Sequence, residues 1–588
     1  MTRGGKAGVA EADHRPKGYV RALFRLHARL AALSRPATGF VSQPEPRTIG
    51  SYARGKQLSA GNFLFAGFLI EGKSQSIWNI AMPDYRFEEA LHGFAWLDDL
   101  AAVGDAIARQ RAQDWTFEWI ARFGRGAGAG WTPDLTGRRL IRWINHAILL
   151  LNGRETSDAK AYFRSLGQQT IFLSRLWQAA SPGLPRFEAL TGLIYAGLAL
   201  SGMERFVSRA SRALARECAR EIDPDGGIST RNPEELMQIF TLLTWAARAL
   251  KDAGKKCQPA HMEAIERIAP ALRAMRHADG GLARFHGGGR GAPGLLDQAL
   301  AEVPGKALTS HAPAMGFLRL TGGRTSVILD GAAPAIGRTS TNAHASTLAF
   351  ELTSGRRPLI VCCGSGVSFG ADWRRAGRAT PSHSTLCIRG YSSSRLSTDG
   401  SGSGARAEFD EVPGHVWTQS EQTAEGQKCL AGHNGYAGTH GMTHLRELLL
   451  TADGRTLTGE DTLGAMTGAD RKTYERLMER LNYAGIDFDL RFHLHPDVDA
   501  TLDMGGTAIS MAQKSGEIWV FRHDGVGEMT LEPSVYLETG RLKPRATRQI
   551  VLSARVSDYA CQLGWTLSKA QDTPTVVRDL EPDDPILR

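Results

Sequence analysis

The sequence lacks the features that mark membrane-spanning, secreted or disulfide-stabilised proteins. No apolar run reaches the ~20 residues of a spanning helix, and no hydrophobic region near the start marks a secretory signal. The seven cysteines are odd in number and scattered, with Cys362 next to Cys363, which argues against a disulfide framework. We therefore expect reduced thiols that pack in the core.

The sequence also lacks a Lys/Arg-rich block with interleaved aromatic residues, so nucleic acid is the least favoured partner. Lys and Arg exceed Asp and Glu by 70 − 61 = 9, and the pI is near 9.2. This modest excess indicates an anionic partner, for which a polyuronate and a membrane surface are the candidates. A hydrophobic fraction of 42% over 588 residues is typical of a globular protein with two or more domains.

Residues 17–33, within an N-terminal segment of residues 1–40, have the pattern of a basic amphipathic helix. Arginines are spaced between leucine, phenylalanine and alanine, so one face is apolar. Such a helix can make peripheral contact with an anionic membrane. A helix that docks on its own protein is the favoured reading, and membrane contact is the alternative.

Helical periodicity dominates residues 41–305. Apolar side chains recur at helical spacing over residues 88–100, 138–151, 187–200 and 260–276. Asn232 followed by Pro233 is a typical helix start, and an apolar stripe continues from there to Leu250. Many helices of similar length, arranged in pairs, indicate an (α/α) toroid.

The hydrophobic period changes from 3.6 to 2 beyond a glycine-rich connection at residues 287–304. Residues 486–494 alternate apolar and polar types, which predicts a half-buried antiparallel strand. Turn signals separate further short strands, and residues 471–481 form a helical insertion. The fold class is therefore multidomain α + β: an N-terminal (α/α) toroid of helix pairs followed by a C-terminal antiparallel β-sandwich over residues 306–588.

Two histidine motifs precede strand-like runs in the second half. Asn342-Ala-His-Ala-Ser-Thr-Leu-Ala-Phe-Glu-Leu352 is the first, and Ser382-His-Ser-Thr-Leu386 is the second. Between them, Pro358-Leu-Ile-Val-Cys-Cys-Gly364 supplies two adjacent thiols. The pattern indicates a polar site built on a β-scaffold.

Other short motifs follow in the same order as in a known family. They are residues 91–97, 137–143, 225–233, 276–285, 316–320, 433–436, 444–446 and 492–496. Together with the histidine motifs they resemble the heparinase II/III-like family of polysaccharide lyases. The resemblance implies a toroid joined to a sandwich, with a substrate cleft between them.

The resemblance also implies a reaction. Family lyases cleave uronate-containing acidic glycans by β-elimination, which needs a group that neutralises the carboxylate, a base for the C5 proton and an acid for the departing oxygen. His344 matches the family's cleft histidine, and its neutral imidazole can serve as base or acid. Tyr436 or His383 is a candidate substitute that could exchange protons. The alternative for His344 is a hydrogen-bonded core histidine.

The chain departs from the family pattern around residue 230. Family lyases carry Asn or Glu shortly after the Asp-Gly and a Tyr-His pair beyond a proline, and these positions fall on Thr230 and on Glu235-Leu236. Arg231 and Asn232, at an expected helix start, are candidate substitutes that would bind a uronate carboxylate. Alternatively, Asn232 only caps the helix and Arg231 is solvated.

A zinc site is a further expectation. Some family members bind a structural metal through His, Asp and His, and the matching places here hold His344, Cys362 and His383, a set that zinc accepts. Buried, inert thiols beside a hydrogen-bonded histidine are the alternative. The lyase reaction itself requires no cofactor.

The favoured function is thus a polysaccharide lyase, and the alternative is a catalytically inactive or divergent glycan-binding protein of the cell envelope. The resemblance implies the periplasm or cell envelope, whereas the absence of a signal peptide favours the cytoplasm. His493 and His495 are expected at the surface of their strand. Trp96, Trp143 and Trp245, at helical spacing, are expected in the core.

Overall fold

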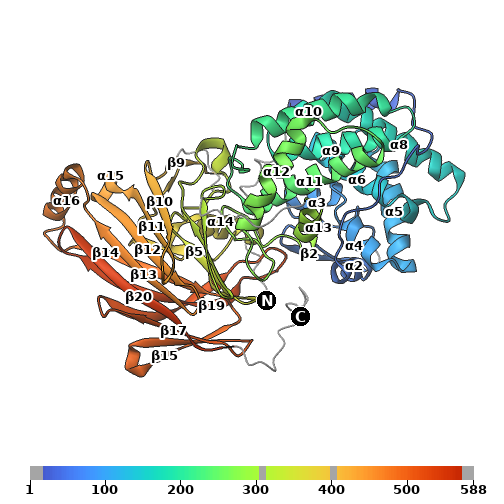
Figure 1. Ribbon diagram of the computed structural model, residues 1–588. Helices are drawn as coiled ribbons and strands as arrows, with labels where there is room; N and C mark the ends of the chain where they lie inside the picture. The colour runs from blue at the N-terminus through green and yellow to red at the C-terminus, as the bar shows by residue number, and fades with distance from the viewer. Residues whose placement is uncertain (1–17, 74, 304–312, 398–406, 573–588) are drawn as a thin grey trace, which may run out of the picture.

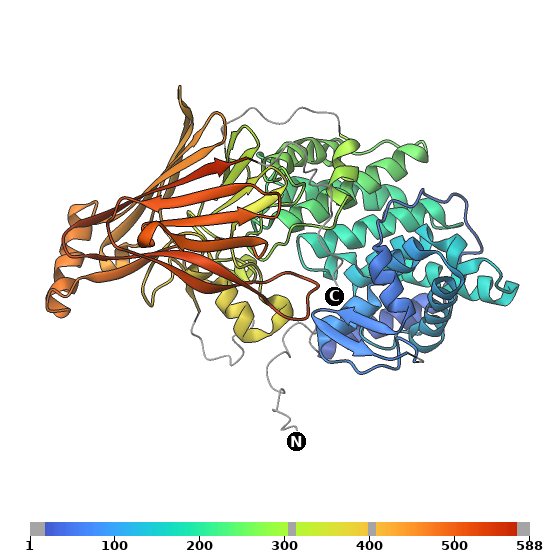
Figure 2. The same ribbon diagram turned by 90° about the horizontal axis from the view of Figure 1, so that it is seen from below.

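The computed structural model describes residues 18–73, 75–303, 313–397 and 407–572. A helical half and a half built of β-sheets lie side by side along the molecule (Figures 1 and 2). The helical half comes first in the chain and carries one β-hairpin, and the second half is antiparallel throughout its strand pairs. The multidomain α + β architecture expected from the sequence is confirmed.

Helices account for most of the first half. They are α1 (Gly18–Ala32), α2 (Tyr52–Ser59), α3 (Tyr85–His92), α4 (Trp96–Val103), α5 (Ala106–Phe123), α6 (Pro133–Asn145), α7 (Ala147–Leu151), α8 (Thr156–Leu176), α9 (Leu184–Ala199), α10 (Val207–Glu221), α11 (Pro233–Asp252), α12 (Pro259–Ala274) and α13 (Leu295–Ala301). The hairpin consists of β1 (Asn62–Phe65) and β2 (Phe68–Glu71). The short helix α13 lies inside the stretch that the sequence presents as a connection.

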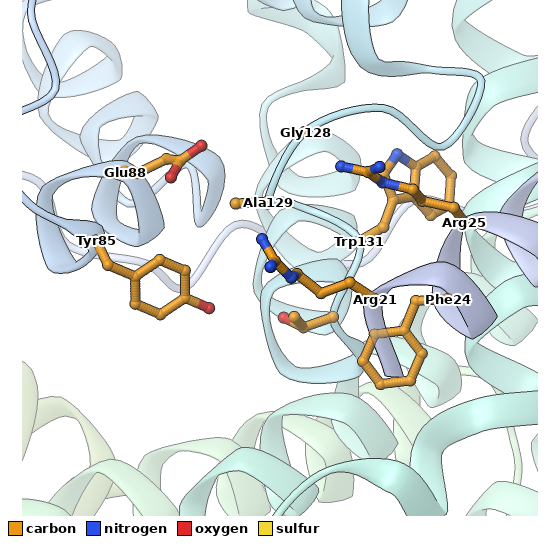
Figure 3. A pocket seen from close by; sticks show the side chains of 9 residues that line it. Arg21, Phe24, Arg25, Tyr85, Glu88, Gly128, Ala129 and Trp131 are labelled. Atoms are coloured by element: carbon orange, nitrogen blue, oxygen red, sulfur yellow. The ribbon is translucent and has the colours of Figure 1, made fainter. Parts of the chain in front are cut away.

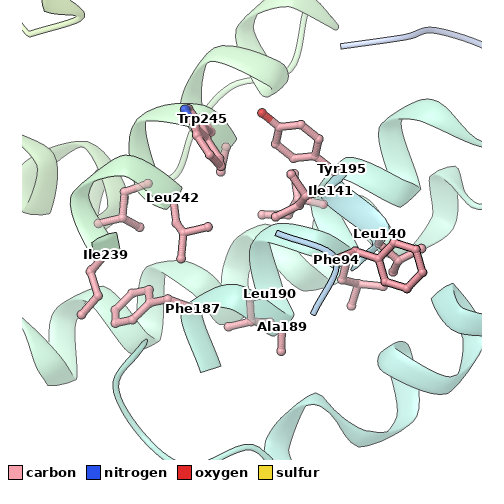
Figure 4. Packing of buried hydrophobic residues seen from close by; sticks show 14 of the residues in the cluster. Phe94, Leu140, Ile141, Phe187, Ala189, Leu190, Tyr195, Ile239, Leu242 and Trp245 are labelled. Carbon is pink, nitrogen blue, oxygen red and sulfur yellow. The ribbon is translucent and has the colours of Figure 1, made fainter. Parts of the chain in front are cut away.

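Helix α9 is buried on nearly all sides because α6 and α11 both pack against it (Figure 4). Leu140 and Ile141 of α6 and Phe187 and Leu190 of α9 contribute to this core. Glycine makes the close approach of α6 and α9 possible, since a Cβ on Gly192 would lie 2.5 Å from the backbone of Gly137. Trp96, Trp143 and Trp245 are buried, as predicted.

Two helices expected to be continuous are broken. Residues 88–100 divide into α3 and α4 at Phe94, whose φ is 59°. This left-handed residue turns the Phe94 ring into the aromatic core, with its centroid 4.7 Å from that of Trp96 and 5.3 Å from that of Trp143. Residues 138–151 similarly divide into α6 and α7 at His146. Burial of a large ring outweighs an uninterrupted helix here.

Helix α1 docks on the helical half, as one of the two readings of residues 17–33 expected. Phe24, Ala28 and Ala31 are buried, and the Phe24 ring packs edge-on against Phe172 of α8 at 6.1 Å. Within the described residues, no helix is both long enough and apolar enough to span a membrane.

Two eight-stranded antiparallel sheets face each other in the second half. The first has the order β10-β11-β12-β13-β20-β17-β16-β15, and the second has the order β18-β19-β14-β6-β5-β4-β3 with β7 paired to β14. Leu448, Phe350 and Trp565 are among the residues of the core between them.

The strand bounds are as follows: β3 (Phe317–Gly322), β4 (Thr325–Asp330), β5 (Phe350–Ser354), β6 (Arg357–Val361), β7 (Leu386–Ile388), β8 (Arg395–Leu396), β9 (Phe409–Glu411), β10 (Val416–Gln422), β11 (Gly426–Tyr436), β12 (Met442–Thr451), β13 (Thr456–Gly464), β14 (Ile486–Leu494), β15 (Val498–Asp503), β16 (Ala508–Gln513), β17 (Ile518–His523), β18 (Glu528–Tyr536), β19 (Arg545–Val556) and β20 (Ala560–Gln571). Strands β8 and β9 form a small separate pair. The helices of this half are α14 (Ala371–Arg378), α15 (Ala437–His440) and α16 (Gly468–Arg480), the last of which is the expected helical insertion.

Strand β14 is more deeply buried than its alternating pattern predicts. It pairs with β19 along one edge and with β6 and β7 along the other, and seven of its nine residues are buried. His493 is only 2% exposed, and His495, just beyond the strand, is 7% exposed. The expectation that these two histidines lie at the surface is therefore wrong.

Candidate functional site at the junction of the two halves

The two histidines singled out by the sequence come together at the junction. His344 lies in the segment that leads from β4 to β5, and His383 lies just before β7. Their ring centroids are 5.0 Å apart, and both side chains are buried, at 1% and 0% exposure. The backbone of the two segments is joined by hydrogen bonds such as Phe350 N to Ser384 O, which sets the spacing of the rings.

Asp330, at the end of β4, is the centre of a polar network beside these histidines. Its carboxylate accepts hydrogen bonds from Arg231 Nη2 at 2.6 Å and from Ser346 Oγ at 2.6 Å, and His286 Nε2 lies 3.3 Å away. Burial alone would raise the pKa of Asp330, but Arg231 and His286 hold that pKa below its usual range. Asp330 is therefore ionised at neutral pH.

Arg231 connects the two halves through this network. Its φ of 54° places it in the left-handed region just before the Asn232 cap. Besides Asp330, its guanidinium donates to the carbonyls of Met315, Gly316, Ala332 and Ala333, at 2.9–3.3 Å. The side chain is 11% exposed, so the expectation of a solvated Arg231 is wrong. The five N–H donors of the guanidinium therefore all have acceptors within the protein.

Asn232 has the capping role that the sequence allowed. Its Oδ1 accepts from the backbone N–H of Glu234 at 3.0 Å and of Glu235 at 3.2 Å. Thr230, where family lyases carry Asn or Glu, donates its hydroxyl to Glu235 Oε2 at 2.8 Å. The two positions at which the sequence departs from the expected lyase pattern thus bond to each other.

Burial keeps both junction histidines uncharged. It lowers the pKa of His344 well below its usual range, with a further contribution from His383. The pKa of His383 falls to about 3, from burial first and then from His493. His344 Nδ1 and both ring nitrogens of His383 have no hydrogen-bond partner among the described residues. Neutral imidazoles can accept protons, but these rings are enclosed by protein.

A second buried carboxylate, that of Glu351 in β5, contacts the junction from the sandwich side. Its Oε2 accepts from the backbone N–H of Arg284 at 3.0 Å and lies 3.5 Å from His277 Nε2. The Arg284 guanidinium donates to the Cys362 carbonyl at 3.2 Å and stacks 3.9 Å from the centre of the Tyr536 ring. Glu351 and Arg284 thus both find their partners within the protein.

The proposed metal ligands do not converge. In the described ranges, no group of three or more His, Cys, Asp or Glu side chains is placed to hold a metal ion. Cys362 is fully buried, and burial raises the pKa of its thiol well above the usual range. The neighbouring Cys363 Sγ lies 3.5 Å from His493 Nδ1 rather than beside His344. The geometry of His344, Cys362 and His383 therefore does not fit zinc.

Tyr436 belongs to the interior of the sandwich. It is 0% exposed, its hydroxyl donates to the Leu386 carbonyl at 3.2 Å, and burial raises its pKa well above the usual range. Its ring contacts His433, which in turn packs against His444. No route to a substrate is open to this hydroxyl in the structure.

Sequence reasoning missed Asp330, His286 and Glu351 as members of the junction. One usable signal was present, because Asp330 ends an otherwise uncharged run, and a carboxylate at that place needs a partner. The partner Arg231 is about a hundred residues away in the chain, and only the meeting of the two halves pairs them.

Comparison with known proteins connects this geometry to a family. Residues 304–566 match the heparinase II/III-like C-terminal domain. Across 565 residues, the chain is 32% identical to FtsZ-localized protein C of Caulobacter vibrioides, covering 93% of this chain and 92% of that protein. This chain belongs to the heparinase II/III-like family.

Solved structures agree on the fold of this family member. Heparinase III superposes with a TM-score of 0.64 at 14% identity, covering 94% of this chain and 89% of that chain. A mutant of the heparan sulfate lyase HepC from Pedobacter heparinus gives a TM-score of 0.56 at 15% identity, covering 94% and 88%. At such low identities the likeness concerns the toroid-plus-sandwich fold.

Proposed function

We propose that this heparinase II/III-like protein acts by binding at the site of cell division and does not catalyse β-elimination. The observation that carries the proposal is the similarity along nearly the whole chain to a relative named for its localisation with FtsZ. The proposal takes the non-catalytic alternative of the sequence analysis and puts the chain in the same compartment as FtsZ.

The junction supports a binding role over catalysis. A lyase needs a free cation or amide for the uronate carboxylate, but Arg231 is saturated by Asp330 and four carbonyls. It also needs an accessible base, whereas His344, His383 and Tyr436 are at most 1% exposed. Opening the junction to substrate would break the Arg231–Asp330 pair.

The decisive test measures absorbance near 232 nm while the protein is incubated with heparan sulfate, chondroitin sulfate, hyaluronan and alginate, with heparinase III as the positive control. We expect no rise, because no unsaturated uronate forms. A rise that His344→Ala abolishes would establish the lyase reading and overturn the proposal.

A separate experiment tests the proposed binding at the division site. A fluorescent fusion of the full chain is imaged in dividing cells before and after FtsZ depletion. We expect a midcell band that disperses when FtsZ is removed. A diffuse signal in cells with normal FtsZ would contradict the proposal even if no lyase activity is found.

The outer face of α1 supports a second function, peripheral contact with a membrane. Although α1 docks on α8, its leucines at 23, 26 and 30 are 43–52% exposed, and Leu33 just beyond it is 83% exposed. Arg21, Arg25 and Arg29 are exposed on the same helix. Apolar side chains flanked by arginines suit the interface of an anionic bilayer.

Flotation with phosphatidylglycerol-containing vesicles tests this contact. Leu26→Asp with Leu30→Asp should abolish co-flotation, because both side chains would have to enter the acyl boundary. Ile148→Asp, which alters a still more exposed apolar residue of α7, should leave it unchanged. Equal flotation of the Leu26/Leu30 variant and the wild type would count against the contact.

A further inference from the structure

A small pocket lies where α1 crosses the helical half, away from the junction. It has a volume of about 160 Å³ and lies between α1, the start of α3 and the loop before α6. Its lining residues are Arg21, Phe24, Arg25, Tyr85, Glu88, Gly128, Ala129, Trp131 and Thr132. Figure 3 shows Tyr85 and Glu88 on one side and Arg21, Phe24 and Arg25 on the other.

Two arginines supply positive charge at this pocket. Arg21 and Arg25 are one helical turn apart on α1, and both are exposed. Neither has an ion-pair partner within the part of the chain that the structure describes. Two unpaired guanidiniums at i and i+4 present parallel donors to an anionic group.

The start of α6 faces the same pocket. Thr132 is the N-cap of this 13-residue helix, yet its side chain makes no capping hydrogen bond, and Pro133 follows at the first helical position. Thr132 is 9% exposed and its Oγ1 has no hydrogen-bond partner among the described residues. A buried, unpaired hydroxyl beside a helix N-terminus indicates a missing ligand group, since both favour an anion.

Aromatic side chains form the wall of the pocket. Trp131 donates its indole N–H to the Phe123 carbonyl at 2.8 Å and is 2% exposed, so only a small apolar part of its ring reaches the pocket. Phe24 is held against Phe172. Rigid aromatic surfaces next to polar groups suit the alternating apolar and hydroxyl faces of a sugar ring.

Carboxylates limit how much negative charge the ligand can carry. Glu88 lines the pocket, and Glu89 follows it on α3. Burial, with the charge of Asp134, raises the pKa of Glu89 to about 7. A polyanion would be repelled here, whereas a ligand with a single anionic group could direct its hydroxyls toward these carboxylates.

We propose that this pocket binds a single sugar ring that bears one anionic group, a carboxylate or a phosphate. Arg21, Arg25 and the Thr132 hydroxyl hold the anion, Trp131 contacts the ring, and Glu88 accepts hydrogen bonds from its hydroxyls. The volume is below the roughly 300–1,000 Å³ typical of drug-sized ligands, which restricts the occupant to about one ring. The proposal is independent of the proposed division-site function.

Isothermal titration calorimetry of the full chain tests it with four probes: glucuronic acid, glucose 6-phosphate, glucose and inorganic phosphate. We expect one of the two anionic sugars to bind, glucose to bind about tenfold more weakly or not at all, and phosphate alone to bind more weakly than the anionic sugar. Which anionic sugar binds decides between carboxylate and phosphate.

Variants assign the binding to this pocket. Arg21→Gln with Arg25→Gln should weaken the anionic sugar by about tenfold or more, since two charge-assisted hydrogen bonds are lost. Thr132→Val, which keeps the shape of the side chain, should weaken it less. Arg29→Gln, on the same helix but outside the pocket lining, is the matched control and should bind as the wild type does.

Three outcomes would overturn the proposal. They are no binding of either anionic sugar to the wild type, equal affinity for inorganic phosphate and the anionic sugar, and unchanged affinity in the Arg21/Arg25 variant. Circular dichroism of each variant confirms that α1 and the rest of the helical half remain folded.

Discussion

Two fully buried arginines, one in each half of the molecule, are stabilised by different kinds of partner. Among the described residues, Arg139 of α6 forms no ion pair, although the charge of Asp134 acts on it. It donates to Gln169 Oε1 at 2.7 Å and to the carbonyls of His92 and Gly130, and it stacks 4.1 Å from the centre of the Trp119 ring. Burial lowers the pKa of Arg139 to about 9.

Arg446 of β12 has a carboxylate partner instead. Its Nε donates to Asp461 at 2.7 Å, and the same carboxylate accepts from His444 Nε2 at 2.7 Å and from Trp565 Nε1 at 2.9 Å. Burial alone would raise the pKa of Asp461, but Arg446 and His444 lower it to about 2. Arg446 is thus held by a complete charge pair, while Arg139 is held by neutral acceptors and an aromatic ring.

The largest expected effect comes from breaking the sandwich pair. Arg446→Met should lower the free energy of unfolding by about 3–5 kcal/mol, because it leaves the Asp461 charge buried without its partner. Thermal unfolding followed by calorimetry measures it. The double variant Arg446→Met with Asp461→Leu should be more stable than the single one, and a double variant that is less stable would contradict the charge-pair account.

Acid should weaken the sandwich before the helical half. His383 has a pKa of about 3 in the folded protein, so between that value and 6.5 the unfolded chain binds the extra proton. Stability therefore falls as the pH drops below 6.5, and His383 alone accounts for about 2 kcal/mol of this loss at pH 5. Histidines with lowered pKa among the described residues are His344, His383, His433, His440, His444, His493 and His495 in the sandwich, His286 at the junction, and His92 and His261 in the helical half.

Hydrogen exchange read by mass spectrometry at pH 5 and pH 7.5 locates this effect, after correction for the intrinsic rates. Protection should be lost first in β5, β7 and β14 and last in α6 and α9. Earlier loss in the helical half would show that other groups control the acid response.

Arg139→Met should lower the free energy of unfolding by about 1–3 kcal/mol, less than Arg446→Met. The acceptors that lose their hydrogen bonds are neutral, so no buried charge remains unpaired. The same calorimetric scan measures it. If Arg139→Met were the more destabilising of the two, the distinction drawn between these two arginines would be wrong.

The smallest effect is expected at the surface. Arg248 pairs with Asp252 one turn later on α11, at 2.9 Å, with both side chains well exposed. Arg248→Ala should change the free energy of unfolding by less than about 0.5 kcal/mol, because water screens the pair. A loss comparable to that of Arg139→Met would indicate that Arg248 has a role beyond this pair.

Local patterns in the sequence predicted those features that depend on near neighbours. The 3.6 and 2 periods separated the halves, Asn232 was recognised as a cap, and the two histidine motifs were expected at one site, where the rings of His344 and His383 do meet. Each of these depends on residues close in the chain or on a repeat that burial imposes.

Features that depend on distant partners were not predictable in the same way. The helix breaks at Phe94 because its ring packs against Trp96 and Trp143. Tyr436 is buried because the two sheets pack face to face. Arg231 was expected to meet solvent or substrate, but it meets Asp330 from the other half.

The sequence by itself determined the two kinds of secondary structure, their order, and which residue types were available for a site, because propensity and hydrophobic period act over a few residues. Only the tertiary structure decided which charges are neutralised by which partners. That decision rests on burial, since a charge such as Arg231 or Asp330 removed from water must find its counterpart wherever the fold brings one within hydrogen-bonding distance.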